Sequence, residues 1–472
     1  MLHSPEGAPA PTTLTGPCPK GPSCLVAGPP AATVSDSPPR NQPRSSAHPP
    51  LSTVHPSSPP SLPPPVLVED EGAMRRLLAA LEDAREVAVD SEADSFYRYR
   101  ERVCLVQMTV GERDWLVDPL APIDLAGLGR VFADRGCVKV FHDGEYDVLI
   151  LGRDHGLRFR NLFDTRIAAA ALGESAPGLG SVVQARFGVQ LDKSQQRSNW
   201  SRRPLTPEQV RYAQLDTHYL IPLMHAMRAE LTERGRVPIV EGECRRLEGM
   251  TAPAHAFDPD DFVRLKGART LNPRQAQLLR ELFILRDELA SRRDVPPFKV
   301  LGNGMLVEIA RHLPRSSRAL EEIEGLSSKV VRRLGDELLD AARRARERGP
   351  LERMPRVPAR DGTGDLDDAA YELHERLKAW RKGRGQAEGL DSSLVLNRRT
   401  LLHLAAARPG DRRALAATNG ILAWQIEAFG DEILALIARF DEDLAAGRIE
   451  PTSRGRGRGR WGSRGEEGRD KD

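Results

Sequence analysis

The chain has 472 residues, and its 69 Lys and Arg against 67 Asp and Glu give a formal net charge of +2. This length predicts about three domains, and a charge near zero neither requires nor excludes a nucleic-acid partner, because the placement of the charges decides. No apolar run approaches the roughly 20 residues that cross a bilayer, and the N-terminus shows no secretory signal, so we expect no membrane association and a cytoplasmic protein.

Residues 1–65 are rich in Pro and Ser and nearly free of aromatic side chains. Such a segment cannot bury enough apolar surface to offset its ordering entropy, which predicts disorder. Beyond it, a helix is predicted at 71–83. Four short β-type runs then follow, at 86–92, 103–110, 115–117 and 138–142. Helical patterns continue at 145–155, 164–172 and 178–187. Strands followed by helices predict an α/β domain with a mixed central sheet and flanking helices, over 66–250.

A longer helix is predicted at 207–232. Thr206 is a suitable N-cap, Pro207 fits the first turn, and Gln209 completes a capping box. Pro222 lies inside this pattern, and we expect it to kink the helix, because proline lacks the amide hydrogen that a helix interior needs.

The remaining sequence is helical and contains a repeat with a constant offset of 95 residues. Matching positions include Leu282 with Leu377, Leu306 with Leu401, Pro314 with Pro409 and Gly335 with Gly430. A constant register through apolar, Pro and Gly positions predicts two copies of one all-α domain. We expect these copies at 268–347 and 367–447, joined by a Pro- and Gly-containing linker at 348–366. A disordered Arg/Gly tail is expected at 448–472.

Several carboxylates stand at the ends of these predicted elements. Asp90 and Glu92 end an apolar strand, and period-two alternation points both to the same face. Two neighbouring acids repel unless a cation neutralises them. Asp147 falls in the first turn of a helix, which the helix dipole favours. Tyr212 and Asp216 share one helix face, being four residues apart. Alone, each feature is more commonly structural: a solvated strand end, a helix-start acid or an accidental pair.

Together these acids match the needs of a metal-dependent nuclease. Hard divalent cations such as Mg²⁺ prefer oxygen ligands. Two of them about 3.5–4 Å apart stabilise both the attacking and the leaving oxygen of a phosphodiester. A tyrosine hydroxyl one helical turn from an acidic ligand is suited to orient or deprotonate the attacking water.

These residues resemble a known family. Val89–Glu92, Phe141–Asp147 and Tyr212–Asp216 are similar to the three motifs of the DEDD exonuclease superfamily, in its tyrosine-bearing form. The run from Lys193 to Leu205 closely resembles ribonuclease D, and the two helical repeats resemble HRDC domains. The resemblance implies a ribonuclease H-like exonuclease domain followed by two all-α HRDC-like domains.

The resemblance also implies roles for particular residues. Asp90, Glu92, Asp147 and Asp216 are expected to hold two divalent ions, Mg²⁺ or Mn²⁺, and Tyr212 to position the water. Two departures from the family pattern stand at positions 91, where Ser replaces the usual Thr, and 199, where Asn replaces the usual Asp. We expect neither departure to touch the four acids.

Substrate contacts are expected near these motifs, from five residues on strands and loops: Gln107, His142, Lys193, Arg197 and Arg203. The three basic residues would neutralise phosphates of a single strand. His142 alone is more commonly structural, and the basic cluster alone is as readily a solvated loop.

The leading hypothesis is a monomeric 3′→5′ exoribonuclease that trims RNA 3′ ends, as in tRNA 3′ maturation, and releases nucleoside 5′-monophosphates. Its substrates would be tRNA precursors with single-stranded 3′ ends. One alternative is a 3′→5′ DNA exonuclease of the Werner type, and another is a catalytically inactive RNA-binding scaffold.

Overall fold

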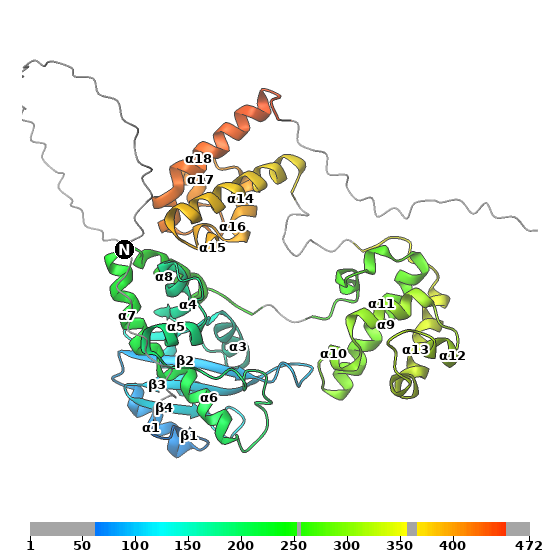
Figure 1. Ribbon diagram of the computed structural model, residues 1–472, viewed down its shortest axis with the longest axis horizontal. Helices are drawn as coiled ribbons and strands as arrows, with labels where there is room; N and C mark the ends of the chain where they lie inside the picture. Colours follow the sequence, from blue (N-terminus) through cyan, green and yellow to red (C-terminus); the bar gives the residue numbers. More distant parts are fainter. Residues whose placement is uncertain (1–61, 253–255, 356–365, 450–472) are drawn as a thin grey trace, which may run out of the picture. The chain divides into compact units, whose positions relative to one another are not determined.

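The computed structural model describes residues 62–252, 256–355 and 366–449, which form an α/β domain and two helical domains (Figure 1). The segments expected to be disordered, 1–65 and 448–472, lie almost wholly outside the described ranges. Most of the expected linker at 348–366 also lies outside them. Residues 62–65 are described, and the carbonyl oxygen of Pro63 accepts a hydrogen bond from the Gln214 amide at 2.8 Å.

Six strands form one mixed sheet in the α/β domain, in the order β1-β4-β3-β2-β5-β6. Their bounds are β1 Val66–Val68, β2 Glu86–Ala93, β3 Val103–Val110, β4 Arg113–Val117, β5 Val138–Phe141 and β6 Leu162–Asp164. The central strands β2 and β3 are antiparallel, and the pairing places Asp90 opposite Gln107 and Glu92 opposite Leu105. Paired residues point to the same face of a sheet, so Asp90, Glu92 and Gln107 share one face.

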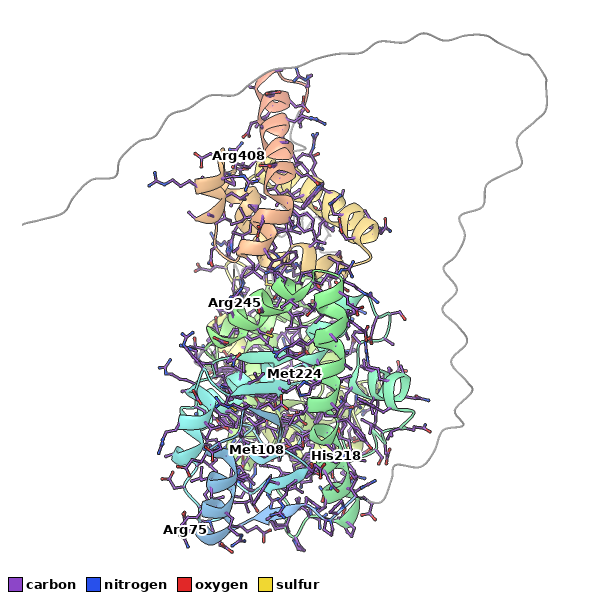
Figure 2. The ribbon with its side chains drawn as sticks, turned by 90° about the vertical axis from the view of Figure 1, so that its left-hand side faces the viewer. Arg75, Met108, His218, Met224, Arg245 and Arg408 are labelled. Atoms are coloured by element: carbon purple, nitrogen blue, oxygen red, sulfur yellow. The ribbon has the colours of Figure 1, made fainter. Side chains whose placement is uncertain are left out.

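Eight helices surround this sheet. Their bounds are α1 Glu71–Leu81, α2 Ala126–Ala133, α3 Glu145–His155, α4 Thr165–Leu172, α5 Leu179–Phe187, α6 Pro207–His218, α7 Leu220–Glu233 and α8 Val237–Glu248. Helix α6 packs against β2, β3 and β4, and α7 packs against β2 and β5. Met108 of β3 and Met224 of α7, labelled in Figure 2, are both fully buried. The core of the domain therefore lies between the sheet and these helices.

The expected capping box is confirmed: Thr206 accepts from the Gln209 amide, and the Gln209 side chain accepts from the Thr206 amide. The expected interruption by Pro222 appears as a break one turn earlier, because proline supplies no amide hydrogen to the His218 carbonyl oxygen, and α6 ends at His218. The helical stretch divides at Tyr219, and α7 begins at Leu220. Pro222 therefore lies in the first turn of α7, where a backbone amide has no intrahelical partner and a missing hydrogen costs nothing.

The two helical domains repeat each other element by element. The first contains two 3₁₀ turns, Pro259–Arg264 and Ala268–Thr270, and then α9 Pro273–Arg293, α10 Pro297–Val300, α11 Asn303–His312, α12 Ser317–Glu321 and α13 Ser328–Arg348. The second contains α14 Asp368–Glu388, α15 Ser392–Val395, α16 Arg398–Ala407, α17 Arg412–Ala416 and α18 Ala423–Ala445. Each of these five helices begins 95 residues after its counterpart, which confirms the repeat. Among the described helices, none combines the length and the apolar character of a membrane span.

Candidate active site

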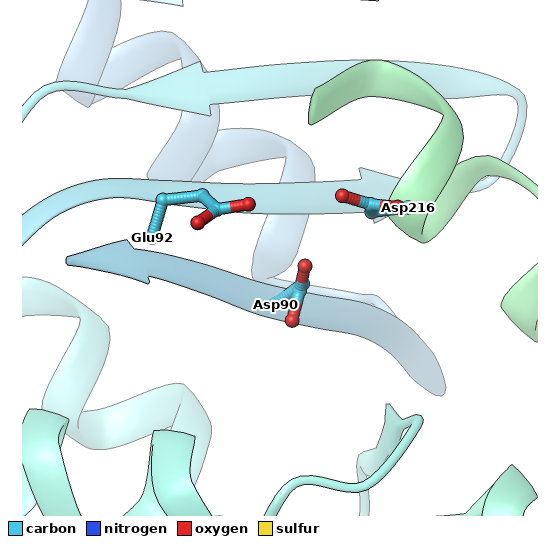
Figure 3. Close-up of side chains that lie close together, drawn as sticks. All are labelled: Asp90, Glu92 and Asp216. Carbon is cyan, nitrogen blue, oxygen red and sulfur yellow. The ribbon is translucent and has the colours of Figure 1, made fainter. Parts of the chain in front are cut away.

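Three carboxylates meet where β2 and α6 approach each other. Asp90 and Glu92 project from β2, and Asp216 projects from α6 toward them (Figure 3). Each offers one carboxylate oxygen, and these oxygens all lie within 4.8 Å of one another. Three anionic oxygens at this spacing form a donor set suited to a divalent cation.

Asp147 borders this group without joining it. It lies in the first turn of α3 and is buried. The hydroxyl of Ser91 donates to its Oδ1 at 2.5 Å. Our expectation that residue 91 would not touch the four acids is therefore wrong.

Burial raises the pKa of all four acids, and repulsion from neighbouring carboxylates adds to it. Burial is the largest cause for Asp90, whose pKa lies well above its ordinary value, and the charges of Asp147, Asp216 and Glu92 add to it. Burial, then Asp216 and Asp147, raise the pKa of Glu92 to about 9. Burial raises the pKa of Asp216 to about 8 and that of Asp147 to about 6. Such a cluster binds protons or a cation in preference to standing fully ionised.

Tyr212 lies one turn before Asp216 on α6 and donates a hydrogen bond to its carboxylate. Burial first, and then the charges of Asp216, Glu92 and Asp90, raise the pKa of the Tyr212 hydroxyl. The ring packs against Trp200, with centroids 5.8 Å apart. The capped start of α6 and this aromatic contact together fix the hydroxyl beside the acids.

The turn before Asp147 is held by Asp164, a buried residue at the end of β6. Its carboxylate accepts from the amides of Asp143 at 3.1 Å and Gly144 at 2.8 Å. Asp143 has a φ of 65°, a left-handed conformation that aspartate tolerates better than most residues. Asp164 thereby sets where α3 begins and where Asp147 stands.

His142 stands at the same turn. Its Nδ1 lies 2.9 Å from Thr165 Oγ1, and that hydroxyl donates to the Phe141 carbonyl oxygen. Nδ1 is therefore the protonated nitrogen, since the hydroxyl hydrogen is already used. Burial lowers the pKa of His142 to about 4, so the ring is neutral at pH 7. His142 therefore supports the turn, and its contact with substrate stays a prediction.

Gln107 lies opposite Asp90 and is completely buried. Within the described residues, neither its amide nitrogen nor its amide oxygen has a hydrogen-bond partner. A buried amide in this state costs free energy. Its position beside the acids agrees with the predicted location in a strand near the site, and its predicted contact with substrate stays a prediction.

The loop from Lys193 to Leu205 places the three basic residues differently. Lys193 and Arg197 are exposed, and the Arg197 guanidinium lies 5.8 Å from the ring centre of Phe96. Arg203 is turned inward. It donates to both oxygens of Asp118 and to the carbonyl oxygens of Trp200 and Cys104. Its guanidinium therefore anchors the loop, whereas the phosphate contacts expected of Lys193 and Arg197 stay predictions.

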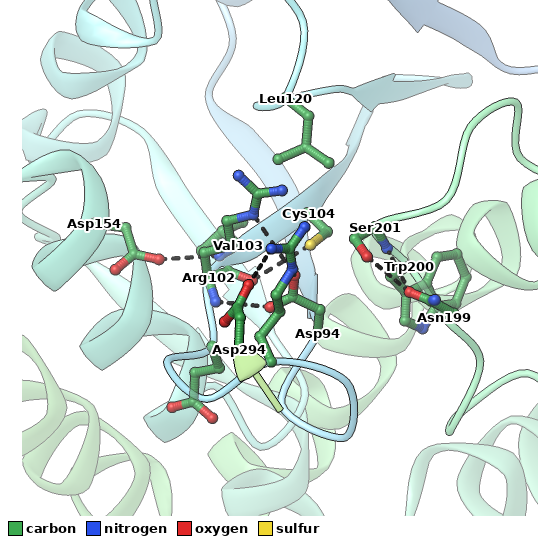
Figure 4. A network of polar contacts seen from close by, with 12 residues as sticks. Asp94, Arg102, Val103, Cys104, Leu120, Asp154, Asn199, Trp200, Ser201 and Asp294 are labelled. Atoms are coloured by element: carbon green, nitrogen blue, oxygen red, sulfur yellow. Dashed lines mark hydrogen bonds and ion pairs between the residues drawn. The ribbon is translucent and has the colours of Figure 1, made fainter. Parts of the chain in front are cut away.

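A second loop follows β2 and is closed by a buried carboxylate, Asp94 (Figure 4). Asp94 Oδ1 accepts from the Arg102 amide at 3.0 Å, and Asp154 accepts from the Val103 amide at 2.9 Å. The figure also shows Asn199, whose side-chain oxygen accepts from the amide and hydroxyl of Ser201. The departure at position 199 thus closes a local turn away from the acids, as expected.

Comparison with known proteins follows the domain division. A 3′-5′ exonuclease family model matches residues 65–232, and an HRDC domain model matches residues 275–341 and 371–437. A ribonuclease D of Acidiphilium cryptum is 30% identical over 405 residues, which cover 84% of this chain and 97% of that protein. The chain belongs to the ribonuclease D family. It is accordingly a 3′→5′ exoribonuclease, with the nucleic-acid-binding HRDC domains of that family and its dependence on divalent metal.

Solved structures agree with the ribonuclease D assignment. The crystal structure of Escherichia coli RNase D matches with a TM-score of 0.58 and 26% identity, over 79% of this chain and 99% of that one. The catalytic core of RRP6 from Trypanosoma brucei matches with a TM-score of 0.56 and 31% identity, over 62% of this chain and 82% of that one. The predicted fold class, an α/β exonuclease domain followed by two helical HRDC domains, is confirmed.

Sequence reasoning missed three residues that hold this site together: Ser91, Trp200 as the support of Tyr212, and Asp164. Asp164 had a usable signal, because an aspartate that directly precedes a helical run is a typical N-cap, and its side chain caps α4. The contact between Ser91 and Asp147 had none, since 56 positions separate the two residues.

Proposed function

We propose that this enzyme hydrolyses single-stranded RNA 3′ ends one nucleotide at a time with two divalent ions, and releases nucleoside 5′-monophosphates. The observation that carries the proposal is the convergence of Asp90, Glu92 and Asp216 within 4.8 Å, beside the hydroxyl of Tyr212. Asp147 completes the proposed ligand set from the edge of the group. Mg²⁺ and Mn²⁺ are both suited to an all-oxygen donor set.

The bound ions would supply charge neutralisation for the attacking and leaving oxygens. The chain's own residues do the rest. The Tyr212 hydroxyl, one helical turn from Asp216, orients the attacking water. Asp216 accepts the Tyr212 hydrogen and thereby fixes the direction of the phenol oxygen. Lys193 and Arg197 neutralise phosphates upstream of the scissile bond.

RNA of the tRNA-precursor type is the proposed substrate. The Escherichia coli relative is described as an exoribonuclease involved in structured RNA processing, which supports this class. Both β2 and α6 belong to one chain, so no second subunit is needed to complete the three-acid group. The proposal therefore includes a monomer, acting in the cytoplasm as expected for the bacterial relatives.

The test uses the full chain and an RNA with a 3′-terminal label, with Mg²⁺ and Mn²⁺ compared. Asp90→Ala and Asp216→Ala should each lower the rate of label release by at least about a hundredfold. Asp83→Ala, which removes an exposed acid of the same domain, serves as the matched control. The released product should be a nucleoside 5′-monophosphate.

Three results would count against the proposal. Unchanged hydrolysis in both Asp90→Ala and Asp216→Ala would contradict the proposed ligand set. Single-stranded DNA degraded as fast as tRNA precursors with added 3′ tails would remove RNA as the preferred substrate and favour the Werner-type alternative. Failure of the wild-type chain to hydrolyse either nucleic acid, with RNA binding retained, would favour the scaffold alternative.

A further inference from the structure

A second buried carboxylate, Asp114 on β4, lies under the helix that carries Tyr212 and Asp216. Only 5% of its surface is exposed. Three residues of α6 surround it. The Gln214 amide donates to Asp114 Oδ2 at 2.8 Å. The His218 Nδ1 lies 3.0 Å from the same oxygen. Thr217 reaches the carboxylate through Thr109.

Thr109 of β3 completes this connection. Its hydroxyl donates to Asp114 Oδ1 at 2.8 Å, and its oxygen lies 2.8 Å from the hydroxyl oxygen of Thr217. All of these hydrogen bonds are buried or nearly so. One carboxylate thus joins two adjacent strands to three side chains of one helix.

The geometry of α6 relates this cluster to the acids of the candidate active site. Successive residues of a helix are about 100° apart around its axis. Tyr212 and Asp216 therefore lie on one side of α6, whereas Gln214, Thr217 and His218 lie on the opposite side. His218 is labelled in Figure 2 on this helix. Hydrogen bonds to the side that carries Gln214 and His218 therefore fix the rotation of α6, and with it the positions of Tyr212 and Asp216.

Stability alone is a poor reason for this carboxylate. Replacing a whole buried polar pair by well-packed apolar side chains is often neutral or stabilising. Apolar contacts lack direction, however, and let a helix rotate or slide by small amounts. Hydrogen bonds to a fixed carboxylate depend strongly on distance and angle, so they define one rotation of α6.

We propose that Asp114 is a positioning residue for the hydrolysis, which holds α6 at the rotation that brings Asp216 and Tyr212 to Asp90 and Glu92. This inference rests on the ligand set in the proposed function. It assigns Asp114 no contact with substrate or with a metal ion. Its effect passes through α6 to the distance between Asp216 and the two acids of β2.

The test measures Mn²⁺ binding to the full chain without nucleic acid, by the electron paramagnetic resonance signal of free Mn²⁺, and separately measures kcat and KM on single-stranded RNA. Asp114→Ala should weaken Mn²⁺ binding by about tenfold and lower kcat by about tenfold to a hundredfold, because small misplacements at a reacting centre have effects of this size. KM should stay within about twofold, since Lys193 and Arg197 lie on a loop outside the Asp114 cluster.

Two further variants separate positioning from folding. Asp114→Asn keeps one acceptor oxygen, so we expect it to restore part of both quantities and to fold if Asp114→Ala does not. Glu243→Gln alters another buried carboxylate, on α8, which pairs with Arg246 at 2.9 Å. It should leave Mn²⁺ binding and kcat unchanged, even where it lowers the melting temperature.

The outcomes are distinguishable. The positioning role is overturned if folded Asp114→Ala, or Asp114→Asn where the Ala variant does not fold, keeps both Mn²⁺ affinity and kcat within about twofold of the wild type. If Asp90→Ala also leaves Mn²⁺ binding unchanged, the ligand set itself is wrong and the proposed function fails with it. Loss of binding in Asp90→Ala together with wild-type binding in both Asp114 variants would overturn the positioning role alone.

Discussion

The hydroxyl of Ser91 donates to Asp147 at 2.5 Å, from the strand position between Asp90 and Glu92. One residue of β2 therefore controls an acid of α3 while its two neighbours contribute to the three-acid group. This hydrogen bond lowers the pKa of Asp147, although burial leaves the pKa raised to about 6.

Ser91→Ala should therefore raise the pKa of Asp147 further. A hydrogen bond to a charged group contributes about 1.5–3 kcal/mol, which corresponds to roughly one to two pH units. We expect the carboxyl carbon of Asp147, followed by NMR in a chelator, to titrate about one pH unit higher than in the wild type. Ser91→Thr keeps the hydroxyl and should retain the wild-type titration. An unshifted titration in Ser91→Ala would show that the Ser91 hydroxyl does not stabilise the ionised form of Asp147.

Tyr212→Phe removes the hydroxyl beside Asp216 and keeps the ring that packs on Trp200. Because the ring contact remains, stability and Mn²⁺ binding should change little. Loss of water orientation should lower kcat by about a hundredfold at constant KM. Steady-state kinetics on labelled RNA measure both parameters. A fall in affinity with unchanged kcat would instead place Tyr212 in substrate binding.

The acid cluster predicts how stability depends on pH. Glu92 has a pKa of about 9 and Asp216 of about 8 in the folded chain, whereas both ionise near pH 4 when unfolded. The folded state thus holds more protons between these values, so stability falls as pH rises from about 5 to 9. We expect the melting temperature in a chelator to fall by several degrees over this range.

Added Mn²⁺ should remove this pH dependence, because a cation replaces the protons and stabilises the folded state by mass action. Glu92→Gln carries no charge at any pH and should flatten the curve in the chelator. Differential scanning calorimetry of both proteins provides the comparison. A metal-independent melting temperature across the range would contradict the assignment of the cluster as a metal site.

The contacts of Arg203 predict a structural effect. Arg203→Met leaves the buried Asp118 carboxylate without its partner and frees the loop that carries Trp200. We expect the free energy of unfolding to fall by about 1–3 kcal/mol, measured by urea denaturation, and faster proteolysis between residues 193 and 205. Arg197→Met, which alters an exposed residue of the same loop, should leave both unchanged while it raises KM.

Periodic elements were predictable from the sequence, and long-range contacts were not. Residues 145–155 and the repeat with an offset of 95 were predicted as observed, because helical periodicity and caps are local signals. Strands β1 and β6 and helices α2 and α8 were missed. The two strands have three residues each, too few for a period, and α8 carries Pro238 at its second position and charged residues along its length.

The acids of the site were predicted by motif, but their arrangement was not. The position of Asp147 at the edge of the group depends on its contact with Ser91. The inward direction of Arg203 depends on Asp118, which lies 85 positions away in the chain. Both are consequences of tertiary packing, which overrides local pattern. The motifs predicted the residues of the site, and tertiary packing determines which partners each of them contacts.

The separation of the three acids along the chain has a consequence for synthesis. Asp90 and Glu92 come from β2, whereas Asp216 follows Glu92 by 124 positions. A nascent chain that ends before α6 has two acids facing the same space and lacks the third. Such a chain also lacks Tyr212. The three-acid group is therefore complete only after the chain has been made through Asp216 and α6 has packed against β2.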